Sequence, residues 1–100
     1  MSSDGYTTTD VHFAAAMMCV YGPSTLNKIE KNGGRAVIHL AIPSLDALGY
    51  RKEYNEGKLG ITDLKAHSQN YEDIMTLIRE LIRNRESTWV SAAWITGRGR

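Results

Sequence analysis

The sequence has only one cysteine, Cys19, so no disulfide can form within the chain, and a reducing compartment suits it. The polar residues 1–5 lack the apolar stretch of a signal peptide. The longest apolar run, residues 11–21 interrupted by His12, is about half as long as a bilayer span. These absences predict a cytoplasmic protein without a transmembrane helix.

The sequence also lacks a large excess of charge of either sign. Twelve Lys and Arg residues against eleven Asp and Glu residues give a net charge of +1, far from the balance of a chromatin-type protein. The net charge therefore does not indicate which kind of molecule the protein binds. The hydrophobic fraction of 42% excludes disordered and low-complexity classes, and 100 residues is the size of one domain.

The N-terminal segment predicts a short strand that leads into a helix. Residues 6–8 are aromatic and β-branched, as strands prefer, and they are followed by two candidate helix caps, Thr9 and Asp10. The alanine- and methionine-rich residues 11–21 are good helix formers with little polar surface, and a Gly-Pro pair follows them. We expect this helix to be buried nearly all round.

A β-hairpin is predicted over about residues 25–42. The turn is Asn32-Gly33-Gly34, because glycines tolerate the positive φ angles that a tight hairpin turn needs. In the second strand apolar residues alternate with a mixed set. The apolar, even-numbered face should lie on the core and consists of Ala36, Ile38, Leu40 and Ile42.

Two helices are predicted in the second half of the chain. Ser44 can cap a short helix that carries Leu45 and Leu48 and closes near residues 55–57. Thr62 or Asp63 caps a long amphipathic helix that runs to about residue 86. Its apolar positions are Leu64, Tyr71, Ile74, Met75, Ile78, Leu81 and Ile82, and its expected solvated face holds Lys65, Glu72, Asp73, Thr76, Arg79, Glu80 and Arg83.

These elements indicate the α+β class, with a small antiparallel sheet packed by an N-terminal helix and a long C-terminal amphipathic helix. The hairpin at 25–42 forms the sheet, and the strand at 6–8 can join it to give three strands. Residues 1–86 make the single domain, and residues 87–100 make a tail that contains tryptophan and arginine.

Neither the thiol nor the histidines form a recognisable reactive motif. Cys19 lies in the most apolar helix, where burial should raise the pKa of its thiol, so we expect a packing residue. The three histidines, His12, His39 and His67, do not have the sequence spacing of metal ligands. We expect no metal site and no other cofactor.

The carboxylates and glycines also have structural explanations. Glu72 and Asp73 are adjacent on a helix, so their side chains point about 100° apart and belong to a solvated face. Asp10 is better explained as a helix cap than as a base. The glycines at 33 and 34 lack the lysine and following helix of a phosphate loop. The chain is therefore predicted not to be an enzyme.

The C-terminal region has the most distinctive composition. From residue 79 onward there are five arginines against two glutamates, and both tryptophans lie between the arginines. Arginine suits bidentate phosphate contacts and tryptophan can stack on bases, which predicts a nucleic-acid interface. Its candidate residues are Arg79, Arg83, Arg85, Trp89, Trp94, Arg98 and Arg100.

Two other interpretations of this region remain open. Arg79 and Arg83 can complement the C-terminal end of the helix dipole while Trp89 and Trp94 fold back onto the core. Alternatively, the tryptophans and their apolar neighbours form a strip that binds another protein or a second copy of the chain.

Three short motifs resemble a small family of phage, prophage and bacterial proteins of unknown function. They are Thr8-Thr9-Asp10 before an alanine-rich helix, Gly34-Arg35 at the start of a strand, and Tyr54-Asn55-x-Gly57-Lys58 before the helix led by Asp63. The likeness spans residues 6–82. It implies the same α+β order and a mobile-element context, hence the cytoplasm of a host cell, but no activity and no catalytic residues.

Together these observations predict a non-enzymatic phage or mobile-element accessory protein. It would bind nucleic acid or a nucleoprotein complex through the Arg/Trp region. The alternative is a protein–protein module, such as an anti-CRISPR-like inhibitor of a host enzyme or defence complex, or an assembly subunit, with Trp89 and Trp94 as anchors.

Overall fold

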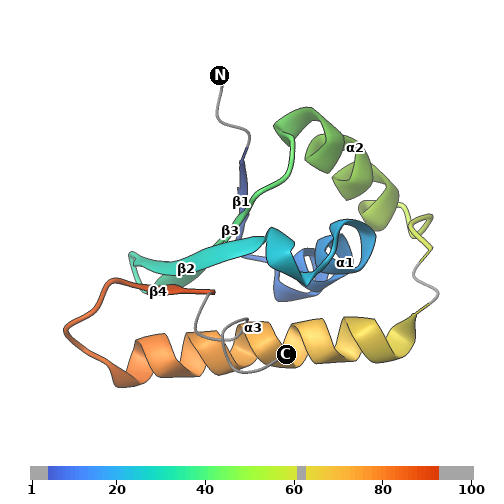
Figure 1. The fold of residues 1–100 in the computed structure, drawn as a ribbon. Helices are drawn as coiled ribbons and strands as arrows, with labels where there is room; N and C mark the ends of the chain where they lie inside the picture. The colour runs from blue at the N-terminus through green and yellow to red at the C-terminus, as the bar shows by residue number, and fades with distance from the viewer. Residues whose placement is uncertain (1–4, 61–62, 93–100) are drawn as a thin grey trace.

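The computed structural model describes residues 5–60 and 63–92, which form three α-helices, one short 3₁₀ helix and four strands (Figure 1). The order along the chain is β1 (Tyr6–Thr8), α1 (Val11–Tyr21), η1 (Pro23–Thr25), β2 (Leu26–Asn32), β3 (Arg35–Leu40), α2 (Ser44–Asn55), α3 (Leu64–Arg83) and β4 (Trp89–Ser91). The predicted α+β class is therefore confirmed.

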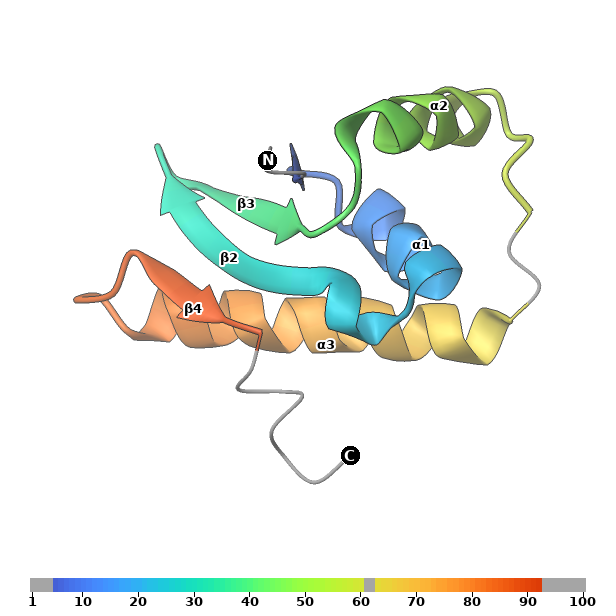
Figure 2. The ribbon, with the colours of Figure 1, turned by 45° about the horizontal axis from the view of Figure 1, so that its top comes forward.

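The sheet is antiparallel and has the strand order β1-β3-β2-β4 (Figure 2). The hairpin formed by β2 and β3 supplies the two central strands. β1 pairs with β3 and places Thr8 opposite Ile38, so the N-terminal strand joins the hairpin as the sequence predicts. β4 pairs with β2 on the other side and places Val90 opposite Ile29. This fourth strand was not foreseen, and it lies beyond the domain boundary drawn at residue 86.

One face of the sheet packs on helices α1 and α3, and the core lies between them. α2 lies beside α1, where Tyr54 meets Phe13 with ring centroids 5.4 Å apart. Burial of apolar surface in this layer is the main stabilising contribution to the fold. The largest fully buried side chains are Phe13, Met17, Ile29, Ile38, Leu40, Ile42, Ile74, Leu77 and Leu81.

Local signals start and join these elements. The Asp10 carboxylate accepts a hydrogen bond from the Phe13 amide and caps α1, and Asp63 caps α3 in the same way through the Ala66 amide. The hairpin turn uses Gly33 and Gly34 at φ 60° and 83°, which only glycine adopts without strain. Both caps and the turn are as predicted.

The helices differ from expectation at their ends. α1 is not buried all round, because Val20 and Tyr21 in its last turn are 41% and 37% exposed. α3 ends at Arg83 rather than near residue 86. Ser44 does not cap α2: its hydroxyl instead donates to the Gly5 carbonyl oxygen at 2.7 Å and ties α2 to the start of β1.

Several side chains also lie on other faces than predicted. Asp73, assigned to the solvated face of α3, is only 6% exposed and accepts a hydrogen bond from Gln69. Leu64 and Ile82, assigned to the apolar face, are 71% and 66% exposed at the two ends of α3. No helix of the described residues is long and apolar enough to span a bilayer.

Candidate functional site

The outer face of the sheet, turned away from α1 and α3, carries polar and aromatic side chains. Because side chains alternate along a strand and Ile29 and Val90 point to the core, their neighbours point outward. Lys28 and Glu30 of β2 therefore lie beside His39 of β3 and Trp89 of β4.

Trp89 is the most exposed of the described Phe, Tyr and Trp residues, at 52%. The Lys28 Nζ atom lies 5.5 Å from the centroid of its ring, within the range of a cation–π contact. Next to them the His39 Nε2 atom is 2.9 Å from Glu30 Oε1. Trp89 is therefore held on a strand and presents much of its ring to solvent beside a cation.

The hairpin tip meets the C-terminal end of α3 and the segment that follows it (Figures 1 and 2). The Lys31 ammonium donates to the Asn84 carbonyl oxygen at 3.3 Å, and the Lys31 amide donates to the Thr88 carbonyl oxygen at 2.7 Å. This junction brings three sequence segments to one end of the molecule, here called the basic end. The basic residues of the hairpin, of the last turns of α3 and of the segment after it are Lys28, Lys31, Arg35, Arg79, Arg83 and Arg85.

Ion pairs leave part of this charge uncompensated. Arg79 lies 3.7 Å from Glu72 and Arg83 lies 3.4 Å from Glu80, with exposed side chains that give weak pairs. Glu30 is hydrogen-bonded to His39, which offsets its negative charge only when the imidazole is protonated. Within the described part of the chain neither Arg35 nor Arg85 forms an ion pair, and the one other carboxylate at this end is Glu86. The basic end therefore attracts anions.

The described members of the predicted site lie on elements that follow one another along the chain. Arg79, Arg83 and Arg85 lie at the end of α3, and Trp89 lies in the adjoining strand. Arg83 occupies the last turn of α3, where a cation complements the helix dipole. Trp89 does not fold back onto the core; its neighbour Val90 packs there instead. The other predicted residues, Trp94, Arg98 and Arg100, lie outside the described residues.

The hairpin cations Lys28, Lys31 and Arg35 were missed at the sequence level. They are separated from the arginines of α3 by more than forty residues, and the contacts of Lys31 with Asn84 and Thr88 bring the hairpin tip to the end of α3. The available signal was their position on and around the hairpin turn. This position indicates that the hairpin tip is exposed to solvent, but it does not indicate that the tip lies against the C-terminal end of α3.

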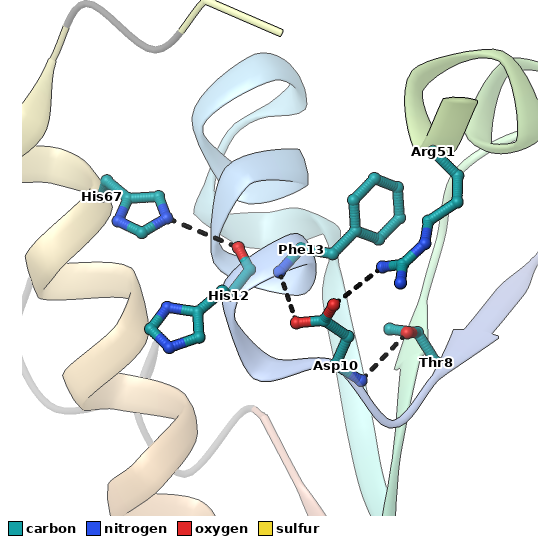
Figure 3. Close-up of polar contacts among 6 residues, drawn as sticks. All are labelled: Thr8, Asp10, His12, Phe13, Arg51 and His67. Atoms are coloured by element: carbon teal, nitrogen blue, oxygen red, sulfur yellow. Dashed lines mark hydrogen bonds and ion pairs between the residues drawn. The ribbon is translucent and has the colours of Figure 1, made fainter. Parts of the chain in front are cut away.

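A second polar cluster joins β1, α1 and α2 (Figure 3). The Asp10 carboxylate accepts from the Phe13 amide at 3.1 Å and from the Arg51 guanidinium at 2.9 Å. The guanidinium carbon of Arg51 also lies 4.9 Å from the Phe13 ring centroid and 5.3 Å from that of Tyr54. The Asp10 carboxylate and the Arg51 guanidinium therefore both have partners within the protein. We assign the cluster a structural role, in which it holds α2 against the start of α1.

Removal of the Asp10 carboxylate should make stability less dependent on pH. Burial raises the pKa of this carboxyl, but the hydrogen bonds from Phe13 and Arg51 and the charge of Arg51 outweigh burial and leave the pKa below 3.8. The ionised form therefore favours folding above pH 3.8, and this contribution is lost as the pH falls through the lower folded-state value. We expect Asp10→Ala to lower the free energy of unfolding by about 2 kcal/mol at pH 7.

Urea unfolding of the parent and Asp10→Ala proteins between pH 2 and pH 7 checks this prediction. Asp10→Asn is the matched control, because it keeps a capping oxygen but removes the charge. A difference between parent and Asp10→Ala that stays constant down to pH 2 would show that the carboxylate charge contributes nothing.

The histidines of α1 and α3 approach each other, which their sequence spacing does not indicate. The His12 and His67 ring centroids are 6.5 Å apart, and His12 stacks on Tyr71 at 4.8 Å. Figure 3 shows His67 directed at the His12 carbonyl oxygen, 3.4 Å from its Nε2 atom. The described residues contain no group of three or more His, Cys, Asp or Glu side chains placed to hold a metal ion.

Cys19 is half-buried near the end of α1. Burial raises the pKa of its thiol, the nearby Asp63 charge raises it further, and the hydrogen bond from Asn70 opposes both. The net shift is upward, in the direction that the sequence predicts. A thiol with a raised pKa carries little thiolate at neutral pH and is a poor nucleophile.

Comparison with known proteins finds no family model, curated protein or solved structure that matches this chain. The resemblance to the phage and prophage family stays a prediction. The function of the site is therefore inferred from the exposure, charge and contacts of its residues.

Proposed function

We propose that this protein binds single-stranded nucleic acid at its basic end and acts by binding rather than by catalysis. The observation that carries the proposal is Trp89: this residue is 52% exposed on the outer sheet face, with the Lys28 ammonium 5.5 Å from the centroid of its ring. A phage or mobile-element accessory role, as the sequence resemblance implies, is part of the same proposal.

The exposed indole favours an unpaired base. In a duplex both faces of a base are covered by its neighbours, whereas a single strand can present a free face to an aromatic side chain. Trp89 lies on a strand with its backbone paired to Glu30, so its position is fixed before a ligand arrives. Stacking on such a platform is tolerant of sequence.

The surrounding cations supply the phosphate contacts. Lys28 lies on the outer face beside Trp89, Arg35 lies at the hairpin tip, and Arg85 lies in the segment between α3 and β4. Arginine can contact a phosphate through two N–H groups, and neutralising phosphates releases condensed counterions. Affinity should therefore fall as salt rises.

Substitution of Trp89 tests the proposal. We expect Trp89→Ala to weaken binding of a fluorescein-labelled single-stranded oligonucleotide about tenfold, because one base loses its stacking partner. Trp89→Phe should retain part of the affinity. The measurement is fluorescence anisotropy at several salt concentrations, with duplex of the same sequence in parallel and circular dichroism to verify the fold.

Lysine variants provide the matched comparison for the charge. Lys28→Ala should flatten the dependence of affinity on salt, whereas Lys52→Ala on α2 removes the same charge from an exposed position away from the basic end and should leave the dependence unchanged. Equal affinity of parent and Trp89→Ala, or tighter binding of duplex, would contradict the proposal. Absence of any binding would also contradict the proposal and would leave the alternative prediction of a protein–protein module anchored at Trp89.

A further inference from the structure

A groove with an apolar floor and a basic rim lies between the inner side of the hairpin tip and the last turns of α3. Its volume is about 350 Å³, and Ile82 on its floor is 66% exposed. The Lys31 ammonium, which also donates to the Asn84 carbonyl oxygen, and Arg35 supply two positive charges. The lining contains no carboxylate and consists of Lys31, Gly34, Arg35, Ala36, Ile78 and Ile82.

Helix α2 presents the complementary surface. Leu45 and Leu48 on its outward side are 83% and 58% exposed, which is unusual for two leucines of one short helix. A shallow hollow of about 380 Å³ runs beside Leu45 and is lined by Asp46, Gly49, Tyr50 and Glu53, without a basic residue. Asp46 also accepts a hydrogen bond from the Tyr21 hydroxyl, which holds its carboxylate at the surface.

A glycine lies in the middle of this helix surface. Gly49 is exposed, and a Cβ atom at this position would meet nothing within 4 Å. Glycine inside a helix is unfavourable by about 1 kcal/mol relative to alanine, and nothing in the same molecule requires it here. A glycine at such a position allows a close approach by the backbone of another molecule.

The two surfaces lie far apart on the molecule, with α2 well separated from the hairpin tip in both views (Figures 1 and 2). They can meet only between molecules. We infer that α2 of one copy docks into the groove of a second copy of this chain, with Leu45 and Leu48 on Ile78 and Ile82 and the carboxylates of Asp46 and Glu53 opposite Lys31 and Arg35.

Charge complementarity selects this occupant. The charged residues that line the hollow beside Leu45 are both acidic and those that line the groove are both basic, so neither lining matches itself. Lys52, which is also exposed on α2, is not among the residues that line the hollow. The contact is heterologous: each copy uses its helix on one neighbour and its groove on another, which gives a ring or an open chain. The inference does not depend on the nucleic-acid proposal, although Lys31 and Arg35 belong to both surfaces.

Complementary charge reversals test the contact without any nucleic acid. The first variant, Lys31→Glu with Arg35→Glu, has a negative groove and a negative helix. The second variant, Asp46→Lys with Glu53→Lys, has a positive helix and a positive groove. Each variant alone should remain monomeric, whereas their equimolar mixture should associate because every groove again meets a helix of opposite charge.

Light scattering and sedimentation over a range of protein concentrations provide the measurement, and circular dichroism verifies that each variant is folded. The parent protein should show a mass that rises above 11.1 kDa with concentration, and Leu48→Ser should weaken the association at least tenfold. A parent that stays at 11.1 kDa at every concentration overturns the inference. A mixture that stays monomeric, or single variants that associate as the parent does, overturns it as well.

Discussion

Replacement of Phe13 by alanine is expected to lower the free energy of unfolding by about 3–5 kcal/mol, a large part of the stability of a domain of this size. Phe13 is fully buried in α1, and its ring meets two other aromatic rings at 5.4 and 5.9 Å, those of Tyr54 and Tyr6. Arg51 lies over the same ring at 4.9 Å. Truncation therefore leaves a cavity where β1, α1 and α2 meet.

Urea unfolding followed by circular dichroism measures this loss. Val20→Ala is a control on the same helix, because Val20 is 41% exposed and its truncation should change the free energy of unfolding by no more than about 0.5 kcal/mol. Equal effects of the two substitutions would show that Phe13 does not join the three elements as the structure indicates.

The substitution Asn70→Asp is expected to cost about 3 kcal/mol at pH 7 and to make the protein more stable in mild acid than at neutral pH. Asn70 is 4% exposed, and its amide donates to the Ala15 carbonyl oxygen at 3.3 Å and to the Cys19 sulfur at 3.4 Å. A carboxylate in this position cannot donate and faces a carbonyl oxygen. Its pKa must rise, and the protonated form recovers a donor.

Stability measured between pH 4 and pH 8 separates this effect from a simple loss of packing. Because the folded-state pKa of the new carboxyl is raised, destabilisation should be greatest above that value and should diminish as the pH falls through it. Ser68→Asp adds the same charge to α3 at an exposed position and should have little effect. A loss of stability independent of pH would contradict the assigned role of the Asn70 amide.

The elements determined by local chemistry were predicted well from the sequence. The caps at Asp10 and Asp63 and the glycines of the hairpin turn act within a few residues of the chain, so their residue types are informative by themselves. Alternation in β3 also predicts which side chains reach the core. These features define the α+β class and most element boundaries.

Features that depend on distant partners could not be predicted in the same way. The residues of β4 favour neither helix nor strand by periodicity, and they become a strand because β2 offers an unpaired edge. Asp73 falls on the polar side of α3 by residue type, yet the packing of the helix buries it. The arginines of α3 indicate a charged end, whereas the approach of the hairpin tip to that end through Lys31 is a property of the tertiary fold.

The strand order β1-β3-β2-β4 determines when the proposed binding surface can form during folding. The two central strands are consecutive in sequence and joined by a two-residue turn, so they can pair within microseconds. β4 must close a loop of more than fifty residues to reach β2, and such distant pairing forms slowly. We therefore expect the proposed platform around Trp89 to form after the hairpin, and a nascent chain to present it only once β4 has been synthesised.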